Sequence, residues 1–500
     1  MQGKWRLKAP DKREHQGGAL TSVSPGTARQ KRSSPHTRLA CLVDPGSFSE
    51  FGKSALARPF SGLGTRPEGD GVVTGSGSVD GRTASVFAQD SGALGGSLGE
   101  THALKIVRLQ QRAMRSRHPL VGLVDSAGAR IQEGVAALDG YGAIFRQNVL
   151  ASGRIPQICV VLGACAGGAV YSPALTDIVI MQSGRGQMFL TGPAVVKEVT
   201  GEDLTGEEIG GARMHSHHSG LAHLVADEEA GAIGLARRVL SYLPDSCWHT
   251  PPAVAGRPAG RMPAVPSEQR KVYDVRAVVG GVVDGESFLE LQPHFAPNLI
   301  TGFARLEGRS VGIVANQPLR LGGVLDAAAG DKGGRFVRLC DAFGIPLVVL
   351  VDTPGFLPGR DQESKGIIRR GAKLLYAFSE ATVPRVTVIL RKAFGGAYIA
   401  MNSRSLGADR VYAWPTAQIA VMGAEAAVGI IHRREIAEHP HRRSRLVSEY
   451  REHVMTPQRA AELLAIDAII QPADTRTVLA AALREIGHPP PVFRHDNLPQ

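Results

Sequence analysis

The chain has 500 residues, of which 43% are hydrophobic and 21% charged, and its formal net charge is +11. This length predicts two large domains, while the absence of a run of about 18 apolar residues argues against a membrane-spanning segment. The cysteines are scattered and include no Cys-x-x-Cys pair, which argues against a disulfide framework or a Cys-type zinc site and predicts a cytoplasmic protein. They are Cys41, Cys159, Cys165, Cys247 and Cys340.

The first 38 residues hold most of the excess positive charge. They contain nine Lys and Arg against Asp11 and Glu14, so +7 of the +11 net charge lies here. The segment is polar, rich in Ser, Gly and Pro and without apolar periodicity, so we expect residues 1–38 to be a disordered basic tail. It lacks the apolar region of a secretory signal, whereas a transit peptide or an extended start would both fit it. Because the rest of the chain is only weakly basic, we expect no nucleic-acid binding.

The two halves of the chain repeat each other at a nearly constant offset. Residues 120–126 (LVGLVDS) match residues 347–353 (LVVLVDT), which lie 227 positions later. Residues 167–169 (GGA) match residues 395–397 (GGA) at an offset of 228. A register held over such a distance indicates an internal duplication.

A proline-rich stretch separates the halves. Prolines fix the backbone angle φ and remove hydrogen-bond donors, so residues 249–266 are predicted to form a linker. We therefore assign a first domain to residues 39–248, a linker to 249–270 and a second domain to 271–500.

Each half shows the same predicted elements in chain order. A β-rich run is followed by a helix, a buried strand, another helix and a second buried strand that ends in the Gly-Gly-Ala turn. The runs lie at 71–88 and 299–315, the first helices at 101–116 and 332–343, and the first buried strands at 120–125 and 347–352. Alternating buried strands and helices predict an α/β fold, and ligands in such sheets bind beyond the carboxyl ends of the strands. Near the C-terminus we expect a pair of charged helices, the second beginning at Thr456-Pro457.

The turn within residues 163–176 (GACAGGAVYSPALT) contains no Lys, His or acidic residue. It lacks the Gly-Lys-Ser/Thr of a P-loop and the G-x-G-x-x-G of a dinucleotide site. Cys165 could be a nucleophile, but its counterpart in the second half is Ala393, which favours a packing role. Backbone N–H groups at a helix start suit an oxyanion hole, in which donors stabilise a developing negative oxygen. Two such turns predict two carbonyl groups that become anionic in one reaction.

The sequence resembles the carboxyltransferase β subunit of biotin-dependent acyl-CoA carboxylases, the acetyl- and propionyl-CoA carboxylase group, and is most similar to actinobacterial members. The resemblance runs from about residue 42 to the end. It rests on residues 141–146 (YGAIFR), 152–157 (SGRIPQ), 163–177, 191–205 (TGPAVVKEVTGEDLT), 316–318 (NQP), 335–342 (RFVRLCDA), 356–363 (FLPGRDQE), 369–373 (RRGAK) and 391–401 (RKAFGGAYIAM). It implies two tandem crotonase-like domains, a hexamer built as a dimer of trimers, and an active site between the first domain of one chain and the second domain of another.

The resemblance also implies the substrates and the site. The donor would be carboxybiotin, carried on a separate biotin carboxylase and biotin carboxyl carrier (α) subunit, and the acceptor an acyl-CoA; no metal is expected in this chain. Gly167 and Gly168 would stabilise the acyl-CoA enolate, and Gly396 and Ala397 the biotin oxygen, although the pairing of turn and substrate stays open. The implied substrate-binding residues are Ala127, Gly128, Arg130, Tyr398 and Ile399.

Residue 399 suggests which acyl-CoA is used. Members that favour propionyl-CoA often carry Asp where this chain has Ile399, as acetyl-CoA-accepting members do. We therefore expect acetyl-CoA to be carboxylated to malonyl-CoA, a precursor for fatty-acid or polyketide synthesis, with propionyl-CoA also accepted. Ala127 departs from the glycine usual in the family at that position.

Some features of the sequence leave alternatives open. His215, His217, His218 and His223 could suggest a metal site, but their irregular spacing favours a polar loop. The basic stretch 433–445 is expected to be a solvated helix face. The main alternative function is another crotonase-like acyl-CoA enzyme, such as a decarboxylase or hydratase; a catalytically silent assembly subunit is a further one.

Overall fold

The computed structural model describes residues 33–60, 63–488 and 490–499, and Ser34–Gln500 forms one compact unit. Most of the predicted disordered tail, residues 1–32, lies outside the described residues. The tail was predicted to extend to residue 38, which is wrong for its last residues, because helix α1 (Pro35–Leu42) begins there with Ser34 as its N-cap. The sequence did not indicate this helix, because Arg38 is charged and looks like part of an exposed tail. In the fold it is buried in long-range ion pairs with Asp125 and Glu229.

The described part of the first half contains an eight-stranded sheet in the order β1-β2-β3-β4-β5-β6-β8, with β7 paired to β5. Its first three strands are antiparallel and the others parallel. The strands are β1 (Ser49–Phe51), β2 (Val72–Val79), β3 (Arg82–Gln89), β4 (Leu120–Ser126), β5 (Gln157–Ala166), β6 (Ile178–Gln182), β7 (Gln187–Phe189) and β8 (Leu224–Ala226).

The second half repeats this sheet in the order β9-β10-β11-β12-β13-β14-β16, with β15 paired to β13. The strands are β9 (Leu289–Leu291), β10 (Leu299–Leu306), β11 (Arg309–Asn316), β12 (Leu347–Thr353), β13 (Arg385–Phe394), β14 (Arg410–Ala413), β15 (Gln418–Ala420) and β16 (Ala468–Ile469). Along the chain, the strands of the first sheet precede residues 251–266 and those of the second sheet follow them. Residues 251–266 contain no helix or strand.

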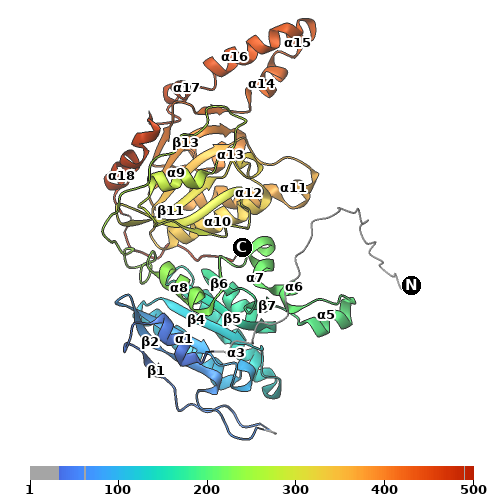
Figure 1. Cartoon of the computed structure of the whole chain (residues 1–500), viewed down its shortest axis with the longest axis vertical. Coiled ribbons are helices and arrows are strands. Elements are labelled where there is room, and N and C mark those ends of the chain that lie inside the picture. The colour runs from blue at the N-terminus through green and yellow to red at the C-terminus, as the bar shows by residue number, and fades with distance from the viewer. Residues whose placement is uncertain (1–32, 61–62, 489, 500) are drawn as a thin grey trace, which may run out of the picture. The chain divides into compact units, whose positions relative to one another are not determined.

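Helices cover both sheets (Figure 1). In the first half they are α2 (Glu100–Ser116), α3 (Val135–Ala151), α4 (Tyr171–Ala174), α5 (Pro193–Thr200), α6 (Gly206–Gly210), α7 (Ala212–Met214) and α8 (Glu229–Leu240). In the second half they are α9 (Val275–Val282), α10 (Ala327–Ala342), α11 (Arg360–Ser364), α12 (Ile367–Glu380), α13 (Gly395–Ala400), α14 (Ala424–Ile431), α15 (Arg433–Glu438), α16 (Arg443–His453), α17 (Pro457–Glu462) and α18 (Thr475–Ile486). None of the helices in the described ranges has the length and apolar character needed to span a membrane.

The hydrophobic core explains why the strands are apolar throughout. Side chains of α2 and α3 pack on one face of the first sheet, and those of α9 and α18 on one face of the second. A third cluster includes residues of α1, α8, α10 and α12 together with strands of both sheets. Strands covered on both faces lose the alternating polar pattern, as in other α/β proteins.

Helix α10 begins five residues before the predicted start, because Asp326 caps it by accepting a hydrogen bond from the Ala329 N–H at 2.8 Å. Two glycines of this helix lie against α12. A Cβ on Gly334 would approach the Lys373 backbone to 3.2 Å, and one on Gly330 would approach the Arg370 carbonyl oxygen to 2.6 Å. The glycines therefore permit close packing of the two helices.

Candidate functional site

Both Gly-Gly-Ala turns have the same backbone conformation. Strand β5 ends at Ala166, and Gly167, with φ +61°, begins a short 3₁₀ turn (Gly167–Val170) that leads into α4. Strand β13 ends at Phe394, and Gly395, with φ +58°, begins helix α13. These left-handed angles favour glycine over residues with a Cβ. The two sheets therefore place equivalent turns at the carboxyl ends of equivalent strands.

The predicted donors lie at the start of each helical segment. The first N–H groups of a helix have no acceptor within that helix, which applies to Gly167 and Gly168 in one half and to Gly396 and Ala397 in the other. Gly396 is exposed, whereas the Ala397 side chain is fully buried. The arrangement can present backbone donors to a negative oxygen without a side chain in the way.

An aromatic ring packs beside each turn, which the sequence reasoning did not foresee. A Cβ on Gly168 would lie 3.2 Å from the Tyr141 ring of α3, and one on Gly396 would lie 3.7 Å from the Phe356 ring. Both aromatic residues belong to motifs noted in the sequence, but their contact with the turns depends on how the sheet brings α3 and the loop after β12 to its carboxyl edge. The rings limit the space available to each turn.

The loop after β4 crosses the end of β5 beside the first turn. Gly128 has φ +98°, and a Cβ there would lie only 2.7 Å from the Ala166 carbonyl oxygen. The neighbouring Ala127 N–H donates to the Gly95 carbonyl at 3.1 Å. The structure therefore brings Gly128 next to the end of β5, directly before Gly167.

Arg130 is engaged inside the protein. Its side chain is 1% exposed, and its Nη1 lies 2.7 Å from carboxylate oxygens of both Asp70 and Glu133. Its Nη2 donates to the Ser97 carbonyl at 2.7 Å. With this geometry Arg130 supports the loop from within, and we do not propose that it contacts substrate.

Comparison of the sequence with models of known protein families identifies the family of this chain. A model of the carboxyl transferase domain matches residues 29–492. This chain belongs to the carboxyl transferase family. The predicted relationship to carboxyltransferase β subunits of acyl-CoA carboxylases is thereby confirmed, as is the prediction that the chain is a carboxyltransferase enzyme.

Three curated relatives show the range of proteins that this carboxyltransferase chain resembles. It is 49% identical to the propionyl-CoA carboxylase beta chain of Saccharopolyspora erythraea, covering 96% of this chain and 93% of the relative. It is 50% identical to a biotin-dependent acetyl-/propionyl-coenzyme A carboxylase beta5 subunit of Mycobacterium leprae, covering 92% and 89%. It is also 49% identical to the methylmalonyl-CoA decarboxylase subunit alpha of Veillonella parvula, covering 93% and 92%.

A solved structure confirms the predicted α/β fold of two crotonase-like domains. Transcarboxylase 12S, described as a hexamer with methylmalonyl-coenzyme A and methylmalonic acid bound, matches with a TM-score of 0.88 and 48% identity. The match covers 91% of this chain and 90% of that chain.

Tyr398 and Ile399 follow the second turn of this carboxyltransferase on α13. Tyr398 is partly buried, and burial raises the pKa of its hydroxyl. Ile399 is 42% exposed, which is high for a large apolar residue. Whether they contact a substrate stays a prediction.

Cys165 has the environment of a packing residue. Its side chain is buried, and burial raises the pKa of its thiol, which disfavours the thiolate that a nucleophile needs. The sequence preference for a packing role agrees with this geometry.

The histidines of residues 215–223 point to different partners. His215 Nε2 lies 2.7 Å from the Met188 carbonyl oxygen, and His217 stacks on His294 with ring centroids 4.4 Å apart. His223 Nδ1 accepts from the Val179 N–H at 3.1 Å, and burial lowers its pKa well below the usual value. Within the described ranges, no group of three or more His, Cys, Asp or Glu side chains is arranged to hold a metal ion.

The basic stretch 433–445 is divided between α15, a 3₁₀ turn and the start of α16, rather than forming one helix. Its arginines are exposed, and two of them pair locally, Arg442 with Glu435 at 3.2 Å and Arg445 with Glu449 at 2.6 Å. Thr456 caps α17 by accepting from the Arg459 N–H at 3.3 Å, as predicted.

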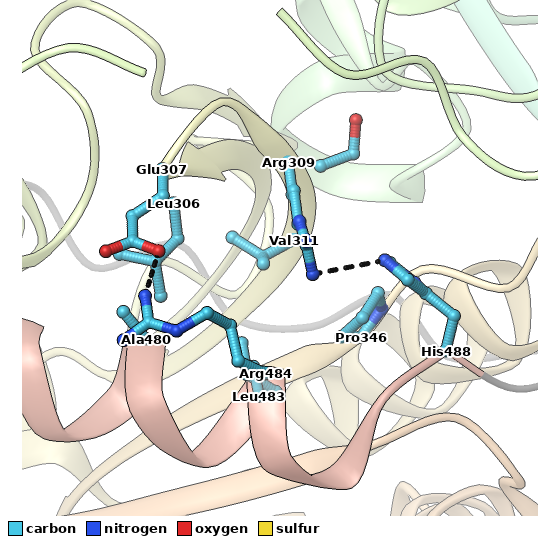
Figure 2. Close-up of a pocket in the computed structure, with 10 residues that line it drawn as sticks. Leu306, Glu307, Arg309, Val311, Pro346, Ala480, Leu483, Arg484 and His488 are labelled. Atoms are coloured by element: carbon cyan, nitrogen blue, oxygen red, sulfur yellow. Dashed lines mark hydrogen bonds and ion pairs between the residues drawn. The ribbon is translucent and has the colours of Figure 1, made fainter. Parts of the chain in front are cut away.

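A small cavity lies between the β10–β11 turn and α18 (Figure 2). Its volume is about 20 Å³, room for roughly one water molecule. Glu307 pairs with Arg484 at its edge, and Arg309 faces His488. Because it lies at the start of β11, away from the carboxyl ends of the parallel strands, this cavity is no candidate for substrate binding.

Proposed function

We propose that this carboxyltransferase transfers a carboxyl group from carboxybiotin, held on a separate biotin-carrying subunit, to a short acyl-CoA. The observation that carries the proposal is the matched pair of left-handed glycine turns at Gly167 and Gly395. A reaction with two anionic oxygens requires two sets of preorganised donors, and this chain offers two equivalent ones.

The first turn would act on the acyl-CoA. When the thioester loses its α-proton to the biotin nitrogen that has released its carboxyl group, negative charge develops on the thioester oxygen, and the N–H groups of Gly167 and Gly168 would donate to it. Gly128, which lies against the end of β5 before this turn, and the neighbouring Ala127 would border the bound thioester. Such donors lower the barrier without any change in their own protonation.

The second turn would act on the biotin group. Carboxybiotin supplies the CO₂ equivalent and a ureido oxygen that gains negative charge, and the N–H groups of Gly396 and Ala397 suit such an oxygen. Both lie at the start of α13, where the helix dipole also favours negative charge. Tyr398 and Ile399 on the same helix would border the acyl group of the bound thioester, which has to lie beside the biotin group for transfer.

Propionyl-CoA is the acceptor that we propose, with acetyl-CoA also used. The expectation of acetyl-CoA rested on Ile399 alone, whereas the relatives are named for propionyl-CoA or for both acyl groups. One methylene distinguishes the two substrates by only about 1–3 kcal/mol, so a strict choice is not expected. A role in supplying malonyl-CoA would then be secondary.

The assembly that we propose is a hexamer, in which the first half of one chain faces the second half of another. Large apolar side chains are exposed on α3, the helix that carries Tyr141, among them Val135 (70%) and Leu138 (60%). Exposed apolar surface of this kind is typical of an interface. The transcarboxylase 12S structure is itself described as a hexamer. We also propose the domain limits 39–248 and 271–500, with α1 added to the first.

A biotin-dependent decarboxylase is the second candidate, because a methylmalonyl-CoA decarboxylase subunit is equally similar. Both reactions use the same transfer step in opposite directions. The test is to mix the pure chain with a biotinylated carrier and to follow the carboxyl group both from carboxybiotin to propionyl-CoA and from methylmalonyl-CoA to biotin. Transfer in neither direction would contradict the proposal. Coupling to ATP and bicarbonate with a biotin carboxylase partner would support the carboxylase over the decarboxylase.

A further inference from the structure

Two buried aspartates occupy equivalent places at the ends of β4 and β12. Asp125 is 1% exposed and Asp352 fully buried, and they lie 227 positions apart. The backbone N–H of each donates to an amide oxygen of the preceding strand, that of Gln89 or of Asn316, at 3.2 Å in both halves. Their surroundings have therefore been retained along with the duplicated strands.

Each aspartate faces an irregularity in the neighbouring strand. Val124 pairs with Val161 but Ser126 pairs with Cys165, so β5 contains two extra residues opposite Asp125. The pairs Val351–Ile389 and Thr353–Ala393 show the same insertion in β13 opposite Asp352. In both halves regular pairing resumes two residues before the left-handed glycine. Bulges of this kind change the direction of a strand and often adjoin active sites.

The carboxylates pack against these bulges. A Cβ on Gly163 would lie only 2.1 Å from Asp125 Oδ1, so the carboxylate lies directly on the bulge backbone. In the second half the Lys392 N–H donates to Asp352 Oδ1 at 3.2 Å, and Lys392 Nζ lies 3.8 Å from the same oxygen.

An arginine neutralises each aspartate, but the two arginines come from different places. Arg38 of α1 donates from both Nη1 and Nη2 to Asp125 Oδ2 at 3.2 Å. Arg391, within the second bulge, donates from Nε to Asp352 Oδ2 at 2.8 Å. The position that matches Arg391 in the first half is Gly163.

Each buried carboxylate is neutralised by an arginine, but the two arginines come from non-equivalent positions. This indicates that the carboxylate itself is needed at this place in each half. A buried carboxylate is costly without a partner, yet both halves keep it and supply the cation by separate routes. The arginines also recruit other segments. Arg38 lies 3.0 Å from Glu229 of α8, and Arg391 Nη1 donates to the carbonyls of Pro266, Glu268 and Lys271, where the linker meets the second domain, at 2.8–3.1 Å.

We propose that Asp125 and Asp352 are positioning residues that fix the bulges of β5 and β13 and thereby the glycine turns that follow. Helix α1 is then a support of the first turn, and residues 266–271, where the linker meets the second domain, are a support of the second. The effect on catalysis rests on the proposed function, whereas the effect on the turns does not.

Hydrogen exchange in the full chain tests the positioning. The variants are Asp125→Asn and Asp352→Asn, and the control is Asp284→Asn. Asp284 is also buried and pairs with Arg476 at 2.7 Å, but it binds the Gly308 N–H before β11, at the opposite end of the sheet. We expect exchange at least about tenfold faster in residues 163–170 only for Asp125→Asn, and in residues 391–398 only for Asp352→Asn. Exchange that rises equally in both turns, or that is unchanged in both, would overturn the proposal.

A milder variant covers the case in which Asp125→Asn does not fold. Ser91→Ala removes only the hydroxyl that donates to Asp125 Oδ2 at 2.8 Å. We expect a smaller but equally selective rise in exchange at residues 163–170. No selective rise in this folded variant would also count against the proposal.

Activity measured on the same variants separates the two ideas. With biotinylated partner present, we expect kcat to fall roughly 10–100-fold for Asp125→Asn and for Asp352→Asn, because small displacements of catalytic groups have effects of this size. We expect kcat to stay near normal for Asp284→Asn. Selective exchange with unchanged kcat would support the positioning but contradict the proposed role of the turns. Lost activity without selective exchange would leave the proposed function standing and overturn the positioning.

Discussion

Gly167 and Gly395 have nearly the same left-handed backbone, with φ +61° and +58°, at the carboxyl ends of equivalent strands. The glycines share this conformation although the segments that follow differ, a short 3₁₀ turn in one half and helix α13 in the other. The retained feature is thus the direction of the backbone N–H groups just after each strand. This direction is what an oxyanion hole requires.

Proline at residue 168 or 397 should nearly abolish transfer. Each substitution removes a backbone N–H that would form part of an oxyanion hole, and proline is tolerated in the first turn of a helix. Loss of one such donor costs roughly 10²–10³ in rate. Steady-state carboxylation by Gly168→Pro and Ala397→Pro measures the effect.

Ser444→Pro is the matched control, because Ser444 is exposed in the first turn of α16, away from both glycine turns in sequence. It should retain near-normal activity. If Ala397→Pro assembles normally and keeps its rate, the second oxyanion hole has been assigned to the wrong residues.

The Tyr141 ring should matter more than its hydroxyl. Tyr141→Phe keeps the ring that packs on Gly168, so we expect activity within about twofold of normal. Tyr141→Ala leaves a cavity in the core and should destabilise the fold by about 3–5 kcal/mol, with lower activity from a less restrained first turn. Chemical denaturation and kcat measure the two effects. Equal loss in both variants would show that the ring contact is not the important feature.

Ile399→Asp should shift the preference further toward propionyl-CoA. The charged side chain widens and polarises the region beside the second turn, and a change of about 1–3 kcal/mol in discrimination is typical of one methylene. The measurement is the ratio of kcat/KM for propionyl- and acetyl-CoA. An unchanged ratio would remove residue 399 from the acyl-binding part of the site.

Acid should destabilise the fold through buried histidines. Burial lowers the pKa of His102 to about 3, and that of His223 lies well below its usual value. The unfolded chain therefore binds more protons than the folded chain between about pH 6.5 and 3, so the free energy of unfolding decreases as the pH falls through this range. The contribution of His102 is at most about 5 kcal/mol.

Comparing the parent with His102→Gln isolates this contribution. The variant should show a shallower loss of unfolding free energy between pH 6.5 and the lowest pH at which both proteins remain folded. If the free energy of unfolding of the two proteins fell in parallel over this pH range, His102 would not make the expected contribution.

The sequence predicted the features that repeat. The offset between residues 120–126 and 347–353 predicted two equivalent strands, and the structure places β4 and β12 at Leu120–Ser126 and Leu347–Thr353. The two glycine turns were also predictable, because glycines directly after an apolar strand interrupt its pattern and favour a turn.

The supports of the site could not be predicted, because they depend on contacts between distant segments. Arg38 looked like part of a polar tail, yet it is buried against Asp125, 87 positions away. Arg130 looked like a ligand-binding arginine, yet Asp70 and Glu133 surround it in the fold. Charge alone does not show whether a side chain points to a ligand or to an internal partner.

The most direct test of the central claim is carboxylation by the purified chain mixed with a biotinylated partner, ATP, bicarbonate and a panel of acyl-CoAs. We predict that propionyl-CoA and acetyl-CoA are carboxylated, that an acyl chain of eight or more carbons is refused, and that no ATP-dependent product forms without the partner. A clear preference for the long acyl chain, or ATP-dependent activity of the verified pure chain alone, would contradict this claim.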